Sequence, residues 1–558
     1  MVEQIKNQIK EIIENKYEIT NLVVEDGKID NVDISVPLFA ISKNLRKNPK
    51  LIFDEISPLL ELKEIKEIVF LNGFLNINLN REAISENVIK KVLAEKTSFG
   101  NSNYNKDEVV VIDYSSPNIA KSFGLGHIRS TMIGNAIKNL YLKTGAKVIG
   151  INHLGDWGTQ FGKMIVAYKK WGKKEEVEKN PIAELQKLYV RFHDEAKENE
   201  NLEQEGRDAF RKLELNDPEM VELWTWFREE SLKEFMEIYD TLKVSFDSYA
   251  GEAFYNDKMD DVVLELENKN LLKVDDGATI VDLEEFNLPP ALIKRSDGAT
   301  LYMTRDLAAL FYRLKTYKFT RAIYVVGNEQ KLHFEQLKSI TKLMGYNLDI
   351  EHVGFGLLMV DGKKMSTRGG KFKRLEDIIT QIVSDANVAI TEKNPNLKNK
   401  EEVSKAVGIG AIIFNDLKNE RNLNVDFNLE NMLKFEGQTG PYIQYSSVRI
   451  TSILKDQKID LDKIDYSYFN QDHYYNAVKT IANFPKIVER ATESRNPSVI
   501  AKYLLDLASQ FNHFYGKQKI VVEDIRHLNT NLSLISSIRD ILDEGMRILG
   551  ITSLKEMW

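Results

Sequence analysis

The 558-residue chain contains no cysteine. This absence excludes disulfides, thiolate zinc sites and a cysteine nucleophile, and it fits the reducing cytoplasm, where we expect the protein to act. No apolar run approaches the roughly 18 residues that a membrane-spanning helix needs, and the charged first helix lacks the apolar core of a secretory signal. We therefore expect neither a membrane partner nor secretion.

The sequence also lacks an excess of positive charge. Its 76 lysines and arginines stand against 84 aspartates and glutamates, which gives a formal net charge of −8. Such a protein can bind nucleic acid only through local basic patches, because its overall field repels phosphate. Hydrophobic residues make up 43% of the chain and charged residues 29%, so it should fold. At about 150 residues per domain, three or four folding units are expected.

The pattern of apolar residues divides the chain into regions. Residues 1–105 open with an amphipathic helix and continue as short strands and helices, which predicts a small α+β domain. From Glu108, a buried strand, a loop, a helix ending at Gly145 and a second strand form a βαβ unit, so a parallel sheet begins there. We expect an α/β domain over 106–375, with a charged helical insertion at about 169–285 and further strands at 321–327 and 353–360, then a helical connecting region over 376–435 and an all-helical region over 436–558.

A glycine-rich loop, SSPNIAKSFGLGHIRST at 115–131, lies between the first buried strand and the following helix. Backbone N–H groups at such a helix start can receive a phosphate, and Gly124 and Gly126 permit its close approach. His127 could then donate a hydrogen bond to a phosphate oxygen. Taken alone, the segment also fits a flexible loop with a helix-capping histidine.

A second glycine-punctuated loop, DGKKMSTRGGKFKR at 361–374, is strongly basic. Lysine ammonium groups beside glycines suit a triphosphate, because each is a point charge on a flexible stem. Taken alone, the segment also fits an ordinary charged surface turn.

Together the two loops resemble the HIGH and KMSKS signatures of class I aminoacyl-tRNA synthetases, and the surrounding motifs narrow the resemblance to the arginyl-tRNA synthetases. These motifs span essentially the whole chain, in the order that the family has. They are SSPNIAKSFGLGHIRSTMIGN, HLGDWGTQFG, LYMTRDLAA, GNEQKLHFEQ, KMSTRGG, GQTGPYIQYSSVR and RILGITSLKEMW.

The resemblance implies a Rossmann-type catalytic domain that forms arginyl-adenylate from L-arginine and ATP, with Mg²⁺, and then transfers arginine to the 3′ end of tRNA(Arg). It further implies that the N-terminal domain contacts the tRNA, that the region 436–558 binds the anticodon, and that adenylate forms only with tRNA bound. We expect a monomer. In this family the protein supplies no covalent intermediate, so positioning and charge stabilisation must provide the rate.

By the same resemblance, the catalytic residues are His127, Lys364 and Lys121. The first histidine of HIGH is replaced here by Gly124 and the second lysine of KMSKS by Thr367. Lys121 or Arg368 is our favoured source of the missing charge, with Lys363 and Lys371 as alternatives. The residues expected to bind ATP are Gly124, Gly126, His127, Glu329, Lys364, Met365 and Ser366.

Arginine recognition requires carboxylates and a flat surface, because a guanidinium is a planar fork that keeps its proton. Tyr302 and Asp306 are four residues apart at an expected helix start, hence on one face, and they match family positions that hold the arginine side chain. Asp306 could instead cap a helix that begins at Thr304. The resemblance adds Asp113 as a second acidic contact, and Asn118 and Gln330 at the amino and carboxylate end.

Each of these added residues has a plainer interpretation. Asp113 also fits an ordinary strand end, and Gln330 and Glu329 also fit helix caps. We interpret His153 and Trp157 as structural. The tail contains aromatic residues that are either base-stacking platforms or core, among them Tyr442, Tyr445, Tyr503, Phe511, Phe514 and Tyr515.

Two other functions stay open on the sequence alone. A small-molecule adenylyltransferase would share the first loop but does not need the helical last third of the chain. A non-catalytic tRNA-binding paralogue is supported only by Gly124 and Thr367.

Overall fold

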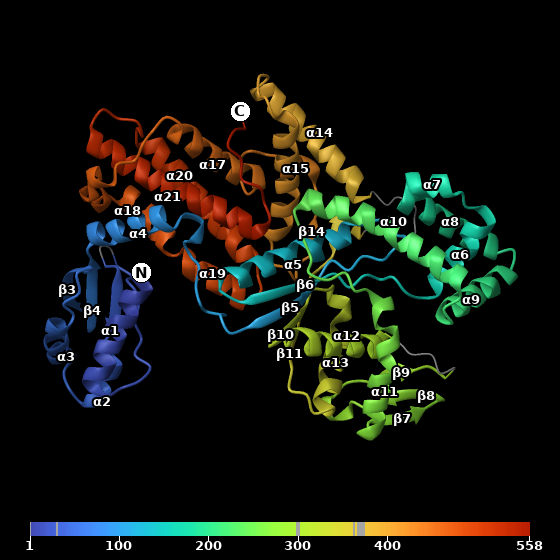
Figure 1. Cartoon of the computed structure of the whole chain (residues 1–558). Helices are drawn as coiled ribbons and strands as arrows, with labels where there is room; N and C mark the ends of the chain where they lie inside the picture. Colours follow the sequence, from blue (N-terminus) through green and yellow to red (C-terminus); the bar gives the residue numbers. More distant parts are fainter. Residues whose placement is uncertain (1, 30–31, 297–301, 361–362, 365–373, 558) are drawn as a thin grey trace.

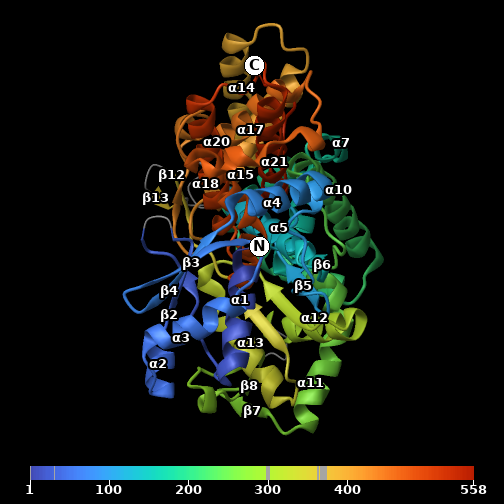
Figure 2. The same cartoon turned by 90° about the vertical axis from the view of Figure 1, so that its left-hand side faces the viewer.

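The computed structural model describes residues 2–29, 32–296, 302–360, 363–364 and 374–557. Figure 1 shows the N-terminal domain and the helical C-terminal part on one side of a central sheet, and the helices from α6 (Thr159–Trp171) to α10 (Pro218–Leu242) on the other side. In the view of Figure 2, helix α4 (Arg81–Glu95) lies between the N-terminal domain and the C-terminal helices.

The described residues of the N-terminal domain form a four-stranded sheet in the order β1-β2-β4-β3. Asn72 and Gly73 join its last two strands, and both have left-handed φ angles, of 52° and 78°. An Asn-Gly pair in this conformation matches the twist of an antiparallel hairpin. The elements are α1 (Val2–Tyr17), β1 (Glu25–Asp26), β2 (Ile34–Pro37), α2 (Phe39–Leu45), α3 (Pro49–Ile56), β3 (Ile65–Leu71) and β4 (Phe74–Leu79).

Four parallel strands form the central sheet of the described chain, in the order β11-β10-β5-β6. Asp113, the last residue of β5, pairs with Tyr324 on one side and Ile151 on the other, so the carboxyl ends of the strands meet at one edge. Ligands of parallel sheets bind at this edge. The strands are β5 (Val109–Asp113), β6 (Lys147–Ile151), β10 (Arg321–Tyr324) and β11 (Asp349–His352).

The expected parallel-sheet α/β architecture, with an α+β domain before it and helices after it, is confirmed. Helix α5 (Leu125–Lys143) connects β5 to β6, as the βαβ pattern predicts. Helix α12 (Tyr302–Tyr317) leads into β10, and α13 (Lys331–Leu343) leads from β10 to β11. The sequence did not indicate β11, because this edge strand has the mixed sequence DIEH, in which only Ile350 is buried.

The charged insertion expected at about 169–285 is helical over most of its length, but from Leu272 onward an antiparallel sheet begins that the sequence patterns did not indicate. Strands β7 (Leu272–Asp275), β8 (Ala278–Val281) and β9 (Ala291–Lys294) have four residues each, and β7 is largely exposed, so they carry little periodic signal. The other helices here are α7 (Lys174–Lys179), α8 (Pro181–Ala196), α9 (Asn201–Glu214) and α11 (Met259–Asn268).

The strand expected over 353–360 is shorter and belongs to a different sheet. Only β12 (Leu358–Val360) is a strand, and it pairs with β13 (Lys363–Lys364) and β14 (Val425–Asp426) rather than with the central sheet. Two glycines, at 354 and 356, precede it, and a side chain at Gly356 would collide with the backbone of Leu423. The backbone at Gly356 therefore packs closely against Leu423, and the strand begins only at Leu358.

The C-terminal part is helical, as predicted. Helix α21 (Ile525–Leu549) is buried along most of its length. Of the six aromatic residues considered above, Tyr503, Phe511 and Phe514 are core, and only Tyr515 is exposed. The other helices are α14 (Leu375–Lys393), α15 (Lys400–Leu417), α16 (Leu429–Met432), α17 (Gly440–Leu454), α18 (Asp472–Ala482), α19 (Phe484–Glu493) and α20 (Ser498–Lys517).

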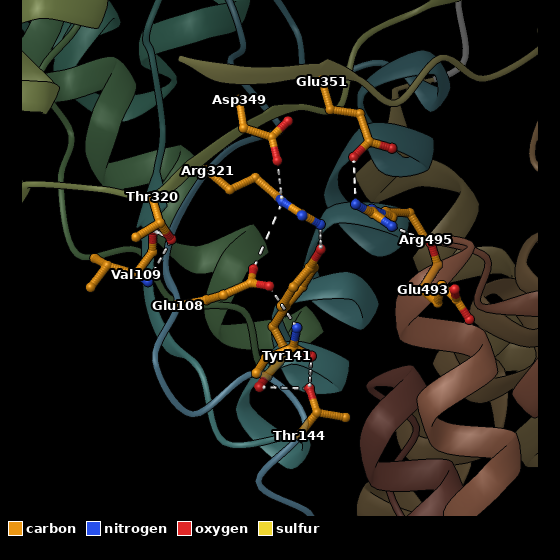
Figure 3. A network of polar contacts seen from close by, with 11 residues as sticks. Glu108, Val109, Tyr141, Thr144, Thr320, Arg321, Asp349, Glu351, Glu493 and Arg495 are labelled. Atoms are coloured by element: carbon orange, nitrogen blue, oxygen red, sulfur yellow. Dashed lines mark hydrogen bonds and ion pairs between the residues drawn. The ribbon is translucent and has the colours of Figure 1, made fainter. Parts of the chain in front are cut away.

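Buried ion pairs attach helix α5 to the C-terminal part at both of its ends. Near its start, Arg129 Nε lies 2.8 Å from Asp416 Oδ1 of α15, and both side chains are buried. At its end, Lys143 Nζ lies 2.9 Å from Glu544 Oε1 of α21, and each side chain is only 2% exposed. A third contact joins the C-terminal part to the central sheet itself, where Arg495 pairs with Glu351 of β11 (Figure 3).

We predict that Arg129→Met destabilises the protein by about 3–5 kcal/mol, because it leaves Asp416 buried without its cation. Burial already raises the pKa of Asp416 and Arg129 lowers it, so the mutation raises this pKa further. A carboxyl group whose pKa is higher in the folded state destabilises that state increasingly as pH rises. Urea unfolding should therefore show a larger loss at high pH than at low pH.

The double variant Arg129→Met/Asp416→Leu is the matched control. It removes both charges, so it should recover most of the lost stability and lose the pH dependence. Equal unfolding midpoints for the single and double variants at both pH values would contradict the prediction.

Candidate active site

The loop that follows β5 has an unusual backbone. Ser115, Ser116 and Ala120 have φ angles of 74°, 48° and 60°, in the left-handed region that residues with a Cβ rarely adopt. Such strain persists only where the surroundings hold it, and it tends to occur at functional sites.

Buried hydroxyl groups hold this loop in place. The backbone N–H of Ser115 donates to Ser130 Oγ at 2.9 Å, and Thr131 Oγ1 donates to Ser115 Oγ at 2.7 Å. Tyr239 of α10 contacts the same Ser115 hydroxyl at 2.8 Å. Helices α5 and α10 thereby fix the path of the chain from the sheet to the start of α5.

The expected phosphate-binding residues lie in the first turn of α5. Gly124 is the N-cap residue, and its backbone N–H donates to His127 Nδ1 at 3.1 Å. Since Nδ1 accepts this hydrogen bond, the neutral imidazole carries its proton on Nε2. A Cβ atom at Gly126 would meet no other atom within 4 Å, so the helix start is open to a ligand there.

His127 is held in its neutral form. Burial lowers its pKa from 6.5 to about 4, with the positive charge of Lys121 as a further cause. At physiological pH this side chain is therefore a hydrogen-bond donor without a charge. Lys121 itself is exposed in the preceding loop.

Helix α14, which follows the basic loop in the sequence, begins beside this helix start. The backbone N–H of Leu375, at the beginning of α14, donates to the carbonyl of Phe123 at 3.2 Å. Lys364 lies in β13, opposite Met359 of β12. The expected site residues Met365 and Ser366, with Thr367, Arg368 and Lys371, lie outside the described residues.

Asp306 lies on the second turn of α12 and contacts the first turn of α13. His333 Nε2 and Asp306 Oδ2 are 2.5 Å apart. Burial raises the pKa of Asp306, but the hydrogen bond and charge of His333, with smaller contributions from His153 and Arg313, lower it more, so that it lies below its ordinary value. The helix begins at Tyr302, so Asp306 is not its cap.

The carboxylate of Asp113 already has an internal partner. Its Oδ2 lies 2.8 Å from Arg313 Nη1, and its Oδ1 accepts a hydrogen bond from Ser116 at 3.0 Å. Arg313 Nη2 lies 3.2 Å from His153 Nδ1, whose ring stacks on Tyr255. Asp113 therefore anchors a buried chain of polar contacts behind Asp306. Its direct contact with the guanidinium of an arginine substrate stays a prediction.

The remaining expected residues lie in the segments that follow β5 and β10 and at the start of α12. Asn118 forms a β-bridge with Gly155, where a Cβ atom would lie only 2.1 Å from the Asn118 Oδ1 atom. Glu329 and Gln330 form the exposed turn between β10 and α13. Tyr302 is 65% exposed at the start of α12. Their contacts with ligands stay predictions.

Sequence analysis missed Arg313 and His333. Arg313 lies seven residues, or two turns, after Asp306 on the same face of α12, and His333 lies three residues after Gln330. Helical periodicity could therefore have placed both beside expected site residues.

No group of three or more histidine, aspartate or glutamate side chains among the described residues is arranged to hold a metal ion. None of the helices in the described part of the chain is both long enough and apolar enough to cross a membrane.

Comparison with family models gives three matches in sequence order. The model described as Arginyl tRNA synthetase N terminal domain matches residues 1–79. The model described as tRNA synthetases class I (R), catalytic domain, matches residues 88–429. The model described as DALR anticodon binding domain matches residues 443–557.

Individual proteins match the chain over almost its full length. Arginine--tRNA ligase 1 of Bacillus thuringiensis subsp. konkukian is 48% identical over 538 residues, covering 96% of this chain and 95% of that protein. Arginine--tRNA ligase of Exiguobacterium sibiricum is 49% identical over 545 residues, covering 97% of each.

Solved structures have the same fold. Arginyl-tRNA synthetase from Plasmodium falciparum superposes with a TM-score of 0.80 at 26% identity, covering 99% of this chain and 98% of that one. The Thermus thermophilus arginyl-tRNA synthetase superposes with a TM-score of 0.77 at 23% identity, covering 99% and 100%, and supports the fold alone.

We predict that His127 remains neutral at pH 5, where a histidine with the ordinary pKa of 6.5 is mostly protonated, because its own pKa is about 4. NMR of histidine-labelled protein measures this directly, with the His127 signal assigned by its loss in His127→Ala. Lys121→Ala should raise this pKa, whereas Lys147→Ala, at an exposed site on β6, should not. A midpoint near 6.5 in the unmodified protein would contradict the prediction.

Proposed function

Because this chain belongs to the arginyl-tRNA synthetases of class I, we propose that it attaches arginine to tRNA(Arg) in two steps, with ATP as the energy source. The observation that carries the proposal is the continuous match of the N-terminal, catalytic and anticodon-binding models along one chain. The helix start at Gly124–His127 and the carboxylate of Asp306 supply the two kinds of site that such a reaction needs: one for phosphate and one for a guanidinium.

In the first step, an oxygen of the arginine carboxylate attacks the α-phosphorus of ATP. The bond to the bridging oxygen breaks, and pyrophosphate leaves with its electron pair. His127 Nε2–H and the backbone N–H of Gly126 would hydrogen-bond the phosphates as charge develops, and Lys364 and Lys121 would balance that charge. Gly124, whose own N–H is used by His127 Nδ1, would contribute by letting the nucleotide approach closely. In the second step, a ribose hydroxyl of the tRNA 3′ end attacks the carbonyl carbon, and AMP leaves.

The remaining ATP contacts and the metal are also proposals. Glu329 would hydrogen-bond the ribose, and Met365 and Ser366 would contact ATP from the basic loop. Mg²⁺ would arrive with ATP, because phosphate oxygens are ligands that this ion prefers.

Arginine would be recognised mainly by Asp306 beside Tyr302. The carboxylate of Asp306 is ionised, and its Oδ1 accepts no hydrogen bond from the other described residues. Tyr302 offers a flat exposed ring on the same helical face. Asn118 and Gln330 would hold the amino and carboxylate end of the amino acid.

We further propose that the chain acts as a monomer in the cytoplasm. The lack of cysteine is consistent with that compartment. The region 436–558 would bind the anticodon, and Tyr515 is its best candidate for a base contact, because it is exposed while carrying the cation of Arg449 over its ring.

Formation of arginyl-tRNA from purified protein, ATP, arginine and tRNA(Arg) tests the proposed function. A small-molecule adenylyltransferase would consume ATP without charging tRNA. A non-catalytic paralogue would bind tRNA but consume no ATP. Either outcome would reject the proposal.

We predict that Asp306→Asn raises the KM for arginine by a factor that corresponds to about 2–4 kcal/mol, the cost of losing one charge from a hydrogen-bonded ion pair. The KM for ATP should change much less. Asp349→Asn is the matched control, because it makes the same change of charge at the opposite end of the sheet, where Asp349 pairs with Arg321. An unchanged KM for arginine in Asp306→Asn would remove this residue from the site.

We also predict that Lys121→Ala lowers the rate of adenylate formation, because Thr367 leaves the site short of one positive charge. Adding Thr367→Lys should partly rescue this variant, since two cations that act on one phosphate group are not additive. Single-turnover rates of the two single variants and the double variant decide the matter. Strict additivity, or a normal rate for Lys121→Ala, would show that Lys121 is not the substitute.

A further inference from the structure

The side chain that most directly controls Asp306 is His333. Its Nε2 lies 2.5 Å from Asp306 Oδ2, which is a short hydrogen-bond contact. Both side chains are partly buried, with 22% of His333 and 28% of Asp306 exposed. The contact joins the start of α12 to the start of α13, and so it links the proposed guanidinium site to the turn that carries Gln330.

This geometry fixes the orientation of the Asp306 carboxylate. A carboxylate on a free side chain rotates about its last bond, and a planar guanidinium needs its oxygens in one defined plane. His333 holds Oδ2, so Oδ1 faces a fixed direction. Of the described residues, His333 is the one that hydrogen-bonds this carboxylate.

We propose that His333 is a positioning residue for arginine, and that protonation of His333 weakens arginine binding. The inference rests on the proposed function and deepens it. A neutral imidazole donates one hydrogen bond and leaves Asp306 with its full negative charge for the substrate. A protonated imidazole neutralises that charge and repels the substrate cation.

Apart from Glu252, the other charged groups around Asp306 do not offer the same switch. Arg313 keeps its charge, because Asp113 and neighbouring tyrosines raise its pKa although burial alone would lower it. Burial lowers the pKa of His153, which favours its neutral form. Glu252 and Tyr324 also face Asp306, and burial raises the pKa of both. Glu252, whose pKa is raised to about 7, is therefore the group that an experiment must separate from His333.

The two groups can be separated by mutation, although each protonation raises the local charge by one unit. Protonating His333 adds a positive charge and should weaken arginine binding. Protonating Glu252 removes a negative charge that already faces Arg305, at 3.9 Å, and this change is independent of residue 333. A variant at residue 333 therefore removes only the contribution of the histidine.

The test measures the KM for arginine, at saturating ATP and tRNA, between about pH 6 and pH 8, where histidine normally changes its charge. In the unmodified enzyme, the KM should fall about tenfold as pH rises, which corresponds to one pKa unit of differential interaction. His333→Gln keeps an N–H donor at the position of Nε2 but cannot titrate. Its KM should stay within about threefold of the high-pH value and lose most of the pH dependence.

Three further variants complete the experiment. His333→Ala removes the donor, so its KM for arginine should be raised about tenfold or more even at pH 8, with a smaller change in kcat. His193→Gln, on the remote helix α8, should retain the full pH dependence. Glu252→Gln should also retain it, since the glutamate is not its source.

The outcomes distinguish this inference from the function on which it rests. An enzyme that forms no arginyl-tRNA would overturn the proposed function. An active enzyme whose arginine KM is flat across this pH range would overturn the switch. Retention of the pH dependence by His333→Gln, or a normal KM for His333→Ala at pH 8, would exclude His333 as its source.

Discussion

The constraint on which the active site depends is the fixed position of helix α5. Its first turn contains Gly126 and His127. Buried ion pairs near both of its ends, Arg129–Asp416 and Lys143–Glu544, attach the helix to the rest of the protein. Charges are costly to bury, and each pair tolerates its burial only while both partners stay in place. The pairs therefore specify where α5 lies more strictly than apolar packing would, and they make the C-terminal helices part of the support for the catalytic residues.

The same principle operates at the carboxyl edge of the sheet. Asp113, at the end of β5, forms an ion pair with the buried Arg313, and Arg313 contacts His153. This chain of contacts fills the interior behind Asp306 with compensated charge. Asp306 itself remains ionised, because the hydrogen bond and charge of His333, with smaller contributions from His153 and Arg313, outweigh the effect of burial and lower its pKa.

The sequence predicted those features that are local and missed those that depend on distant partners. The strand–loop–helix pattern around Gly124 placed α5 correctly, because its signals lie within about thirty consecutive residues. The Arg129–Asp416 pair joins residues far apart in the chain, and no periodicity records it. Strand β11 was missed because its polar sequence resembles a loop, and only its pairing with β10 makes it a strand.

The division of labour between His127 and Lys121 follows from their electrostatics. A protonated His127 would add a charge at the phosphates, but this charge would also hold the leaving pyrophosphate. With a pKa of about 4, His127 would instead orient the phosphates through one hydrogen bond and add no net charge. Positive charge would then come from side chains that can move with the phosphates, and the exposed Lys121 is our proposed source. The charge of Lys121 also lowers the pKa of His127 and so helps to keep it neutral. One lysine would therefore both balance the phosphate charge and maintain the neutral imidazole.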